Sequence, residues 1–409
     1  MSATLCRGCG APLTLELADL GSSPLANSYL EPAALAAAEP FLPLCVYVCT
    51  GCWLAQLPEC ATPEAIFSDY SYFSSFSESW LAHARAYVAM AVDRFALDGT
   101  SQVVEIASND GYLLRWFVER GVPVLGIEPA ANVAKAAEAL GIPSLVRFFG
   151  SELARELVAS GRRADLLLGN NVLAHTPALN DFVAGMKILL APGGAITMEF
   201  PHLVRLVEGN QFDTIYHEHF SYFSLVAVER VFARQGLSLF DVEELPTHGG
   251  SLRIYAQHTG GPHPVSPRVA ALAARERELG VETNDYYRTF AEKVRETKRG
   301  LLEFLIAAKR EGRSVVGYGA PAKGNTLLNF CGVRTDFLDY TVDRSPHKQG
   351  RFLPGTRIPI HAPERIFATR PDYVLVLPWN LRDEIAEQMA GVRAWGGRFV
   401  VAVPEVEVF

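Results

Sequence analysis

The chain has 409 residues, more than one hydrophobic core usually serves, so we expect two or three domains. Hydrophobic residues make up 49% of the sequence and charged residues 20%, which is typical of a globular protein. The formal net charge of −8 leaves no basic footprint, so nucleic acid is not an expected partner. No apolar run exceeds a strand in length and the first residues lack a secretory pattern, so we expect a cytoplasmic protein without membrane contact.

Six of the seven cysteines lie within the first 60 residues. Four of them form two CxxC pairs, each with a glycine in its turn: Cys6, Cys9, Cys49 and Cys52. In a reducing compartment such clustering favours a metal over disulfides, and two pairs complete a closed tetrahedral zinc site. The sequence therefore predicts structural zinc, with a redox pair as the alternative.

An aromatic and hydroxyl-rich segment follows the cysteines and turns into an amphipathic helix. Tyr70, Tyr72 and Phe73 lie in its first part. Such a cluster is either ordinary packing or a lid over a polar ligand, and the sequence does not decide between them.

Residues 101–200 have an alternating strand–helix rhythm. We expect strands at 103–107, 123–128, 165–169 and 195–200, helices at 112–120 and 132–140, and a turn at 191–194. This alternation predicts a parallel sheet with helices on both faces and a ligand at the carboxyl ends of the strands.

The loop after the first strand of this domain indicates which ligand binds. A dinucleotide would need glycines where Ala107 and Asn109 stand, whereas S-adenosylmethionine has no phosphate and tolerates these side chains. Glu105 can orient the loop, and Glu128, at the end of the next strand, can bind the two ribose hydroxyls. Asn170 follows the third strand, where the methionine amine or the substrate would lie. NAD is the alternative ligand.

A histidine-rich segment follows this domain. In it, Glu218 lies beside His219, and Tyr216 and Tyr222 flank the pair. An acid beside an imidazole can tune its pKa for proton abstraction, whereas no further residue is spaced to complete a metal site there. His175, at a strand exit, is placed to join the same cleft.

The remaining chain predicts an edge strand and a second strand–helix array. The edge strand follows the glycines at 249–250, and a long helix at 283–310 leads into the array. Its first strand runs into a small-residue loop and a helix start that carry Lys323 and Asn325. We interpret this as a phosphate site of a nucleotide-bearing substrate, with a second redox cofactor as the less favoured alternative.

Taken together, these segments resemble the nucleotide-sugar C-methyltransferases of antibiotic deoxysugar pathways. The resemblance spans essentially the full chain and is closest to enzymes that methylate C-3′ of dTDP-4-keto-deoxysugars, as in tetronitrose-type biosynthesis. It is carried by the motifs CRGC, CTGC, EIASNDGYLL, GIEPAANVA, GNNVLAHTP, YHEHFSYFSL, HGGSLRIY and GYGAPAKGNTLLNF. It implies an α/β protein with a zinc-binding module at 1–65, a class I S-adenosylmethionine methyltransferase domain with a Rossmann-like fold at 66–260, and a C-terminal Rossmann-like domain at 261–409.

The resemblance also implies residue roles. The zinc ligands fall on the four cysteines, and the cofactor loop falls on Ala107 through Gly111, with Glu128 as the ribose acid. The implied active-site group is Tyr70, His175, Tyr216, Glu218 and His219, with His219 as the general base. The repetitive run around Tyr70 also permits a match to Tyr72 instead.

The expected function is S-adenosylmethionine-dependent methylation of carbon in a dTDP-4-keto-deoxysugar by a base-generated enolate. A sugar O-methyltransferase is one alternative. A non-catalytic nucleotide-sugar binding protein and a nicotinamide oxidoreductase are alternatives of other classes. We expect a monomer.

Overall fold

The computed structural model describes residues 4–67 and 74–409. The chain divides into two compact units, each built from separate stretches of sequence. Unit 1 comprises Met1–Thr14, Val48–Leu203 and Glu218–Glu282, and unit 2 comprises Leu15–Tyr47, Val204–His217 and Thr283–Phe409. The predicted domain boundaries at residues 65 and 260 stay predictions.

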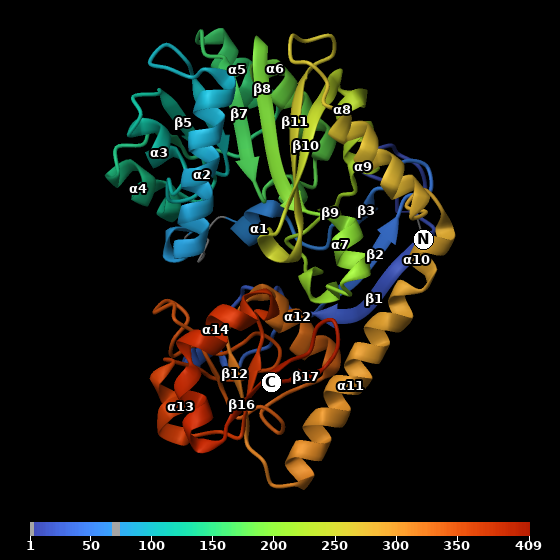
Figure 1. Cartoon of the computed structure of the whole chain (residues 1–409), viewed down its shortest axis with the longest axis vertical. Coiled ribbons are helices and arrows are strands. Elements are labelled where there is room, and N and C mark those ends of the chain that lie inside the picture. Colours follow the sequence, from blue (N-terminus) through green and yellow to red (C-terminus); the bar gives the residue numbers. More distant parts are fainter. Residues whose placement is uncertain (1–3, 68–73) are drawn as a thin grey trace. The chain divides into compact units, whose positions relative to one another are not determined.

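Unit 1 is built on a seven-stranded sheet in the order β10-β11-β8-β7-β4-β5-β6 (Figure 1). Its strands are β4 (Val103–Ile106), β5 (Val124–Ile127), β6 (Ser144–Leu145), β7 (Ala164–Asn170), β8 (Leu190–Pro201), β10 (Leu237–Leu245) and β11 (Ser251–His258). The pairs from β6 to β8 are all parallel, and only β11 runs antiparallel to its neighbours β8 and β10. The carboxyl ends of the six parallel strands therefore meet at one edge.

Helices cover both faces of this sheet. They are α1 (Pro63–Phe67), α2 (Glu78–Phe95), α3 (Leu114–Val118), α4 (Ala131–Ala139), α5 (Ser151–Ala159), α6 (Leu179–Leu189), α8 (Leu225–Arg234) and α9 (Pro267–Glu278). Side chains alternate across a strand, so Val103 packs with α2 and α3, whereas Val104 packs with α5, α6, α8 and α9. The result is a three-layer α/β/α unit with one core on each face of the sheet.

The predicted strands and helices of residues 101–170 are confirmed, with α3 shorter than expected. Two other predictions are wrong. Residues 191–194 belong to β8, because a side chain on Gly194 would lie 2.8 Å from the carbonyl oxygen of Ala164 and the glycine thus lets the strands approach. The strand after the glycines at 249–250 is not an edge strand, because β11 lies between β10 and β8. The polar residues of β11 are typical of a strand at the edge of a sheet. Arg253 can nevertheless be buried within β11, because it forms ion pairs with Glu199 and Glu243.

Two short strands complete unit 1 near the cysteines. β3 (Ala55–Gln56) pairs with β9 (Ser221–Tyr222) in antiparallel register, Ala55 opposite Tyr222 and Gln56 opposite Ser221. The segment after β9 runs beside the residues after β8, since Leu203 N–H donates to the Phe223 carbonyl at 2.9 Å. The predicted histidine segment therefore lies next to the carboxyl edge of the sheet.

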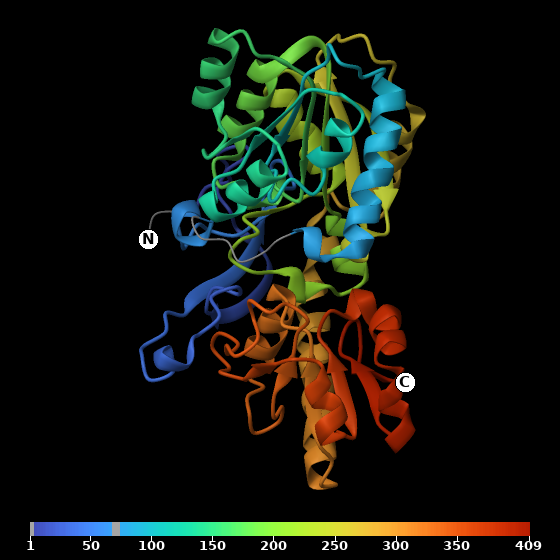
Figure 2. The same cartoon turned by 90° about the vertical axis from the view of Figure 1, so that its left-hand side faces the viewer.

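Unit 2 contains a second α/β array. Its six-stranded sheet has the order β14-β13-β12-β15-β16-β17, with parallel pairs except for β17. The strands are β12 (Val315–Tyr318), β13 (Thr341–Val342), β14 (Ile360–His361), β15 (Tyr373–Val376), β16 (Arg398–Val401) and β17 (Glu407–Val408). The helices of residues 364–369 and 382–388, at the red end of the colour scale, pack on one face of this sheet (Figures 1 and 2).

The other elements of unit 2 are β1 (Leu15–Ser23), β2 (Leu42–Val48, its last residue in unit 1), α7 (Leu203–Glu208, its first residue in unit 1), α10 (Asn284–Arg288), α11 (Phe290–Arg310), α12 (Ala322–Cys331), α13 (Glu364–Thr369) and α14 (Arg382–Gln388). The helix expected at 283–310 is thus two helices, α10 and α11. β1 neighbours β2 and contacts α10, α11 and α12. Within the described part of the chain, no helix is long and apolar enough to span a bilayer.

Candidate functional site

The four predicted zinc ligands converge in unit 1. Their sulfur atoms all lie within 4.8 Å of one another, with Cys6 and Cys52 at 3.5 Å and Cys9 and Cys49 at 3.4 Å. A tetrahedron with zinc–sulfur bonds of about 2.3 Å has edges of about 3.8 Å, so this donor set fits a zinc ion. Four sulfurs leave no open coordination position, so the ion stabilises the fold and takes no part in chemistry.

Loss of one ligand should release the metal. For Cys52→Ser we expect the zinc content, measured by plasma mass spectrometry, to fall well below one ion per chain. The free energy of unfolding should fall by at least about 3 kcal/mol, because metal binding contributes folding energy. Cys45→Ser, outside the cluster, should retain zinc. Full zinc content and stability in Cys52→Ser would contradict the assignment.

The predicted cofactor loop lies at the carboxyl edge of the sheet, between β4 and α3. Ala107, Asn109 and Gly111 all have positive φ angles of 58°, 51° and 77°. A Cβ atom on Gly111 would lie 2.3 Å from the Cδ1 atom of Ile142, so this position requires glycine. The backbone thus forms a tight turn around the space that follows β4.

Two buried carboxylates shape this turn. Glu128 accepts hydrogen bonds from the backbone N–H groups of Asn109 at 3.0 Å and Ala130 at 2.9 Å, which fixes the loop against the end of β5. Burial raises the pKa of Glu128 although these two amides lower it. Burial, with the charges of Asp110 and Glu128, raises the pKa of Glu105 well above its ordinary value. Among the described residues, neither oxygen of Glu105 has a hydrogen-bond partner.

The loop is also held from the side of α2. The 3-10 helix Ser74–Phe76 directly follows the undescribed residues 68–73, and the N–H of Ser74 donates to Asn109 Oδ1 at 2.9 Å. The N–H of Ser75 donates to Asp110 Oδ2 at 3.1 Å. Tyr70, Tyr72 and Phe73 lie outside the described residues, so the predicted role of Tyr70 stays a prediction.

The carboxyl end of β7 places two side-chain amides, of Asn170 and Asn171, at the same edge of the sheet. Asn170 Nδ2 lies 3.5 Å from the hydroxyl of Tyr112, in the cofactor loop segment. Asn171, at a φ of 56°, places its Nδ2 atom 3.2 Å from His248 Nε2. The ring of Trp80 stacks on Tyr112 and is tilted against His248. Asn170 therefore lies beside the residue that follows the loop, and its role at the methionine amine or the substrate stays a prediction. His248, the histidine before the two glycines, lies at this edge too.

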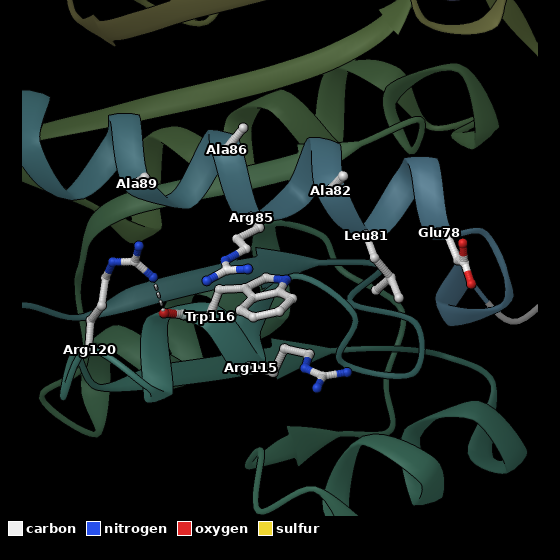
Figure 3. Close-up of a pocket in the computed structure, with 9 residues that line it drawn as sticks. All are labelled: Glu78, Leu81, Ala82, Arg85, Ala86, Ala89, Arg115, Trp116 and Arg120. Carbon is white, nitrogen blue, oxygen red and sulfur yellow. Dashed lines mark hydrogen bonds between the residues drawn. The ribbon is translucent and has the colours of Figure 1, made fainter.

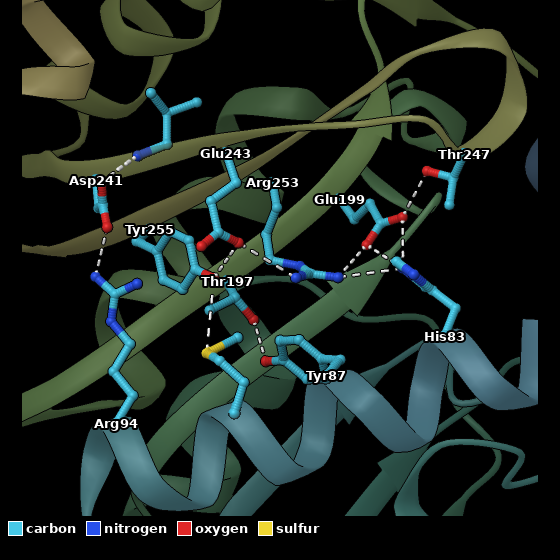
Figure 4. A network of polar contacts seen from close by, with 12 residues as sticks. His83, Tyr87, Arg94, Thr197, Glu199, Asp241, Glu243, Thr247, Arg253 and Tyr255 are labelled. Carbon is cyan, nitrogen blue, oxygen red and sulfur yellow. Dashed lines mark hydrogen bonds and ion pairs between the residues drawn. The ribbon is translucent and has the colours of Figure 1, made fainter.

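Helix α2 is fixed to the sheet by a buried polar network that the sequence analysis did not find (Figure 4). His83 Nε2 contacts both carboxylate oxygens of Glu199, at 3.0 and 2.9 Å, and Arg253 Nη2 donates to Glu199 at 2.8 Å. Burial raises the pKa of Glu199, but His83 and Arg253 outweigh it, so the net shift is downward. Thr247 also donates to Glu199, at 3.0 Å, which ties the turn before β11 to the network.

The predicted catalytic histidines meet in unit 1. The ring centroids of His175 and His219 are 4.8 Å apart in an edge-to-face arrangement, and the ring of Tyr222 lies 6.0 Å from His219. His175 ends the 3-10 helix that follows β7, and His219 and Glu218 precede β9; both of the latter are buried. Tyr216 belongs to unit 2.

Burial lowers the pKa of His175 to about 4. The unfolded chain therefore binds a proton at His175 between about pH 6.5 and pH 4 that the folded chain does not, and stability is lost as the pH falls through this range. For the wild type relative to His175→Gln, we expect an additional loss of about 2 kcal/mol in unfolding free energy between pH 7 and pH 4.5. Urea titrations at both pH values measure it, and a pH-independent difference would contradict it.

The predicted phosphate-binding residues belong to unit 2, in the first turns of α12. Lys323 Nζ donates to Asn380 at 2.8 Å and lies 4.7 Å from the ring centroid of Trp379. Burial lowers the pKa of Lys323, and the charge of Asp213 opposes this shift. Asn325 Nδ2 donates to the carbonyl oxygen of Ala26 at 2.6 Å. Both side chains therefore have internal partners, and their phosphate role stays a prediction.

A cavity of about 580 Å³ lies elsewhere on unit 1, between α2 and α3. The guanidinium groups of Arg85 and Arg115 lie 5.2 and 4.9 Å from the ring of Trp116, and Arg120 donates to the Trp116 carbonyl (Figure 3). None of the predicted site residues lines this cavity. It is therefore separate from the predicted cofactor and catalytic residues.

Three family models match consecutive parts of the chain. A zinc binding domain matches residues 6–67, a methyltransferase domain 80–242, and a C-methyltransferase C-terminal domain 246–404. A curated relative, the C-methyltransferase NovU of Streptomyces niveus, is 39% identical over 406 residues, covering 98% of this chain and 96% of the relative.

Two solved methyltransferase structures each match half of the chain or less. Magnesium protoporphyrin IX methyltransferase from Synechocystis PCC 6803 has a TM-score of 0.34 and 15% identity, over 43% of this chain and 78% of its own. The 1,6-didemethyltoxoflavin-N1-methyltransferase of Burkholderia thailandensis has a TM-score of 0.36 and 18% identity, over 50% of this chain and 95% of its own.

The family models and the zinc cluster define a class I S-adenosylmethionine-dependent methyltransferase with a structural zinc site. On the near full-length relative and the family models, the chain belongs to the C-methyltransferase family. The predicted fold class, enzyme class and cofactors are therefore confirmed, and the nicotinamide alternative is wrong.

Proposed function

We propose that the protein methylates a carbon next to the ketone of a dTDP-4-keto-deoxysugar, and that this carbon is C-3′. The observation that carries the proposal is the contact between the rings of His175 and His219 beside the carboxyl edge of the cofactor sheet. The name of the relative from Streptomyces niveus, a C-methyltransferase, supports carbon as the acceptor.

Methylation of carbon requires a carbanion equivalent, and a C-4′ ketone acidifies the neighbouring C–H bond. In the proposed reaction, His219 takes the proton from this carbon, and the electron pair moves toward the ketone oxygen to form an enolate. His175 is neutral near pH 7, because burial lowers its pKa to about 4, so it can donate an N–H to the enolate oxygen without carrying charge. Tyr216 or Tyr70 is a further proposed donor, and Glu218 sets the charge around His219.

S-adenosylmethionine, when bound, would supply an electrophilic methyl group: the enolate carbon would form a bond to this methyl group as the methyl–sulfur bond breaks, with S-adenosylhomocysteine as the leaving product. The chain's contribution is to align the two reactants and to fix the cofactor loop, through Glu128 and the positive-φ backbone of Asn109. We propose that Asn170 and Tyr222 border the two ligands, and that Lys323 and Asn325 bind the nucleotide end of the substrate.

The test is incubation of the zinc-loaded protein with S-adenosylmethionine labelled with ¹³C in its methyl group and a panel of dTDP-4-keto-deoxysugars. The expected product has a new C–CH₃ signal that couples to C-3′ in the NMR spectrum. Coupling to C-5′, the other carbon beside the ketone, would correct the position only, whereas an O–CH₃ signal would indicate an O-methyltransferase. Binding of the nucleotide sugar without any transfer would indicate a binding protein.

A further inference from the structure

The first CxxC pair, residues 6–9, is called the zinc knuckle below. The side chain of Arg7 within this knuckle extends away from the metal site. Arg7 lies between the ligands Cys6 and Cys9, and its guanidinium donates to the Leu57 carbonyl at 2.6 Å and to Ser221 Oγ at 3.2 Å. It also donates to the carbonyl oxygen of Phe220 and lies over the ring of that residue, 5.5 Å from its centroid. Three of these contacts are therefore made to the two residues that directly follow His219.

A second path joins the same strand to a zinc ligand. Gln56 Nε2 donates to the sulfur of Cys6 at 3.1 Å, and its Oε1 atom accepts from the backbone N–H of Arg7 at 2.9 Å. Gln56 is also the β3 residue opposite Ser221 in β9. Cys6, Gln56, Arg7 and β9 thus form one continuous network, which ends at the strand that starts two residues after His219.

Side chains other than that of Arg7 also attach the knuckle to the rest of unit 1. Arg234, in α8, donates to the Gly8 carbonyl at 2.9 Å, and Asn180, in α6, donates to the Arg7 carbonyl at 2.9 Å. These two bonds hold the backbone of the knuckle from the helix side. The guanidinium of Arg7 is directed to β9, and its planar fork of donors fits several carbonyl and hydroxyl acceptors at once.

We propose that Arg7 is a positioning residue for the methyl-transfer reaction: it uses the zinc knuckle as a rigid base to fix β9, and thereby sets the position of the His219 ring against His175. This inference rests on the proposed role of His219 as the base. The zinc ion then acts at a distance, because it keeps Arg7 and Gln56 in place, and takes no part in the chemistry. A misplacement of the base by about 1 Å is enough to cost about 10²-fold in rate.

The experiment compares Arg7→Gln with Arg234→Gln, which removes a bond to the same knuckle but does not touch β9. Both proteins are assayed for zinc content, affinity for S-adenosylmethionine, and kcat and KM with the dTDP-4-keto-deoxysugar that the wild type methylates. We expect Arg7→Gln to keep zinc, cofactor affinity and KM but to lose about 10²-fold in kcat, whereas Arg234→Gln keeps its kcat. Unchanged kcat in Arg7→Gln would overturn the proposal.

A second measurement does not depend on turnover. In ligand-free protein labelled with ¹⁵N-histidine, the imidazole signals of His219 and His175, assigned from the His219→Gln and His175→Gln variants, should shift in Arg7→Gln but not in Arg234→Gln. This separates failure of the positioning role, in which no signal shifts, from failure of the proposed reaction, in which signals shift but the wild type transfers no methyl group. If Arg7→Gln loses zinc, the same two measurements on Arg7→Lys decide: a zinc-loaded Arg7→Lys with wild-type kcat and signals overturns the proposal.

Discussion

Replacement of His219 by glutamine should reduce kcat for methyl transfer by about 10²–10⁴-fold, the range that a general base contributes. Glutamine retains a similar size and a hydrogen-bonding end but cannot take a proton from carbon. The affinity for S-adenosylmethionine, measured by calorimetry, should stay near that of the wild type, because His219 contacts His175 and Tyr222 and lies outside the loop of residues 107–111.

The matched control is His258→Gln. His258 ends β11, which runs antiparallel to β8, so it lies at the opposite edge of the sheet, with its Nε2 atom 3.3 Å from the Leu190 carbonyl. This variant should keep kcat and cofactor affinity. A His219→Gln enzyme with wild-type turnover would remove the base assignment, and an equal loss of kcat in His258→Gln would show that any histidine change perturbs the fold.

The sheet of unit 1 could be predicted because its information is local. The strands β4, β5 and β7 are short, largely apolar runs that each end in a polar loop, and this repeated pattern predicts both the parallel sheet and the edge where ligands bind, whereas the two-residue strand β6 carries no such signal. Glu105 and Glu128 were found for the same reason, since each acid lies at the end of such a run. The CxxC spacing similarly places two sulfurs within reach of one ion without help from the rest of the chain.

The polar network on α2 could not be predicted, because its partners are distant in sequence. His83 and Glu199 are 116 residues apart, and Arg253 is a further 54 residues away. Each of them alone resembles a solvated side chain, and only the fold pairs them. The error about β11 has the same origin: the sequence does not show that Glu199 is the partner of Arg253, and this carboxylate neutralises the arginine inside the sheet.

The same limit applies to the surroundings of the segment that carries the proposed base, His219. Glu276 is fully buried, accepts from His202 at 2.7 Å and from the N–H groups of Leu225 and Val226, and so fixes the start of α8 after β9. Nothing near Glu276 in the sequence distinguishes it from the charged residues around it in α9. The sequence thus predicted which histidines gather at the site but not the residues that hold them there.

The Glu128→Ala change should weaken S-adenosylmethionine binding by at least about 10²-fold, because it acts on the cofactor and on the loop together. The carboxylate accepts the N–H groups of Asn109 and Ala130, and these donors would be left buried without partners, at about 1–3 kcal/mol each. The predicted bonds to the ribose hydroxyls would be lost in addition. Calorimetry with the cofactor and urea unfolding measure the two effects separately.

Glu128→Gln distinguishes the two contributions. Its amide oxygen can accept one of the two N–H groups, whereas its NH₂ group meets the other donor and cannot, so we expect an intermediate loss of stability but a cofactor affinity close to that of Glu128→Ala. Glu119→Gln, an exposed acid at the end of α3, is the control and should change neither quantity. If Glu128→Ala bound S-adenosylmethionine as the wild type does, the cofactor would not use the end of β5, and the role assigned to the loop of residues 107–111 would be wrong as well, because Glu128 is the group that fixes that loop.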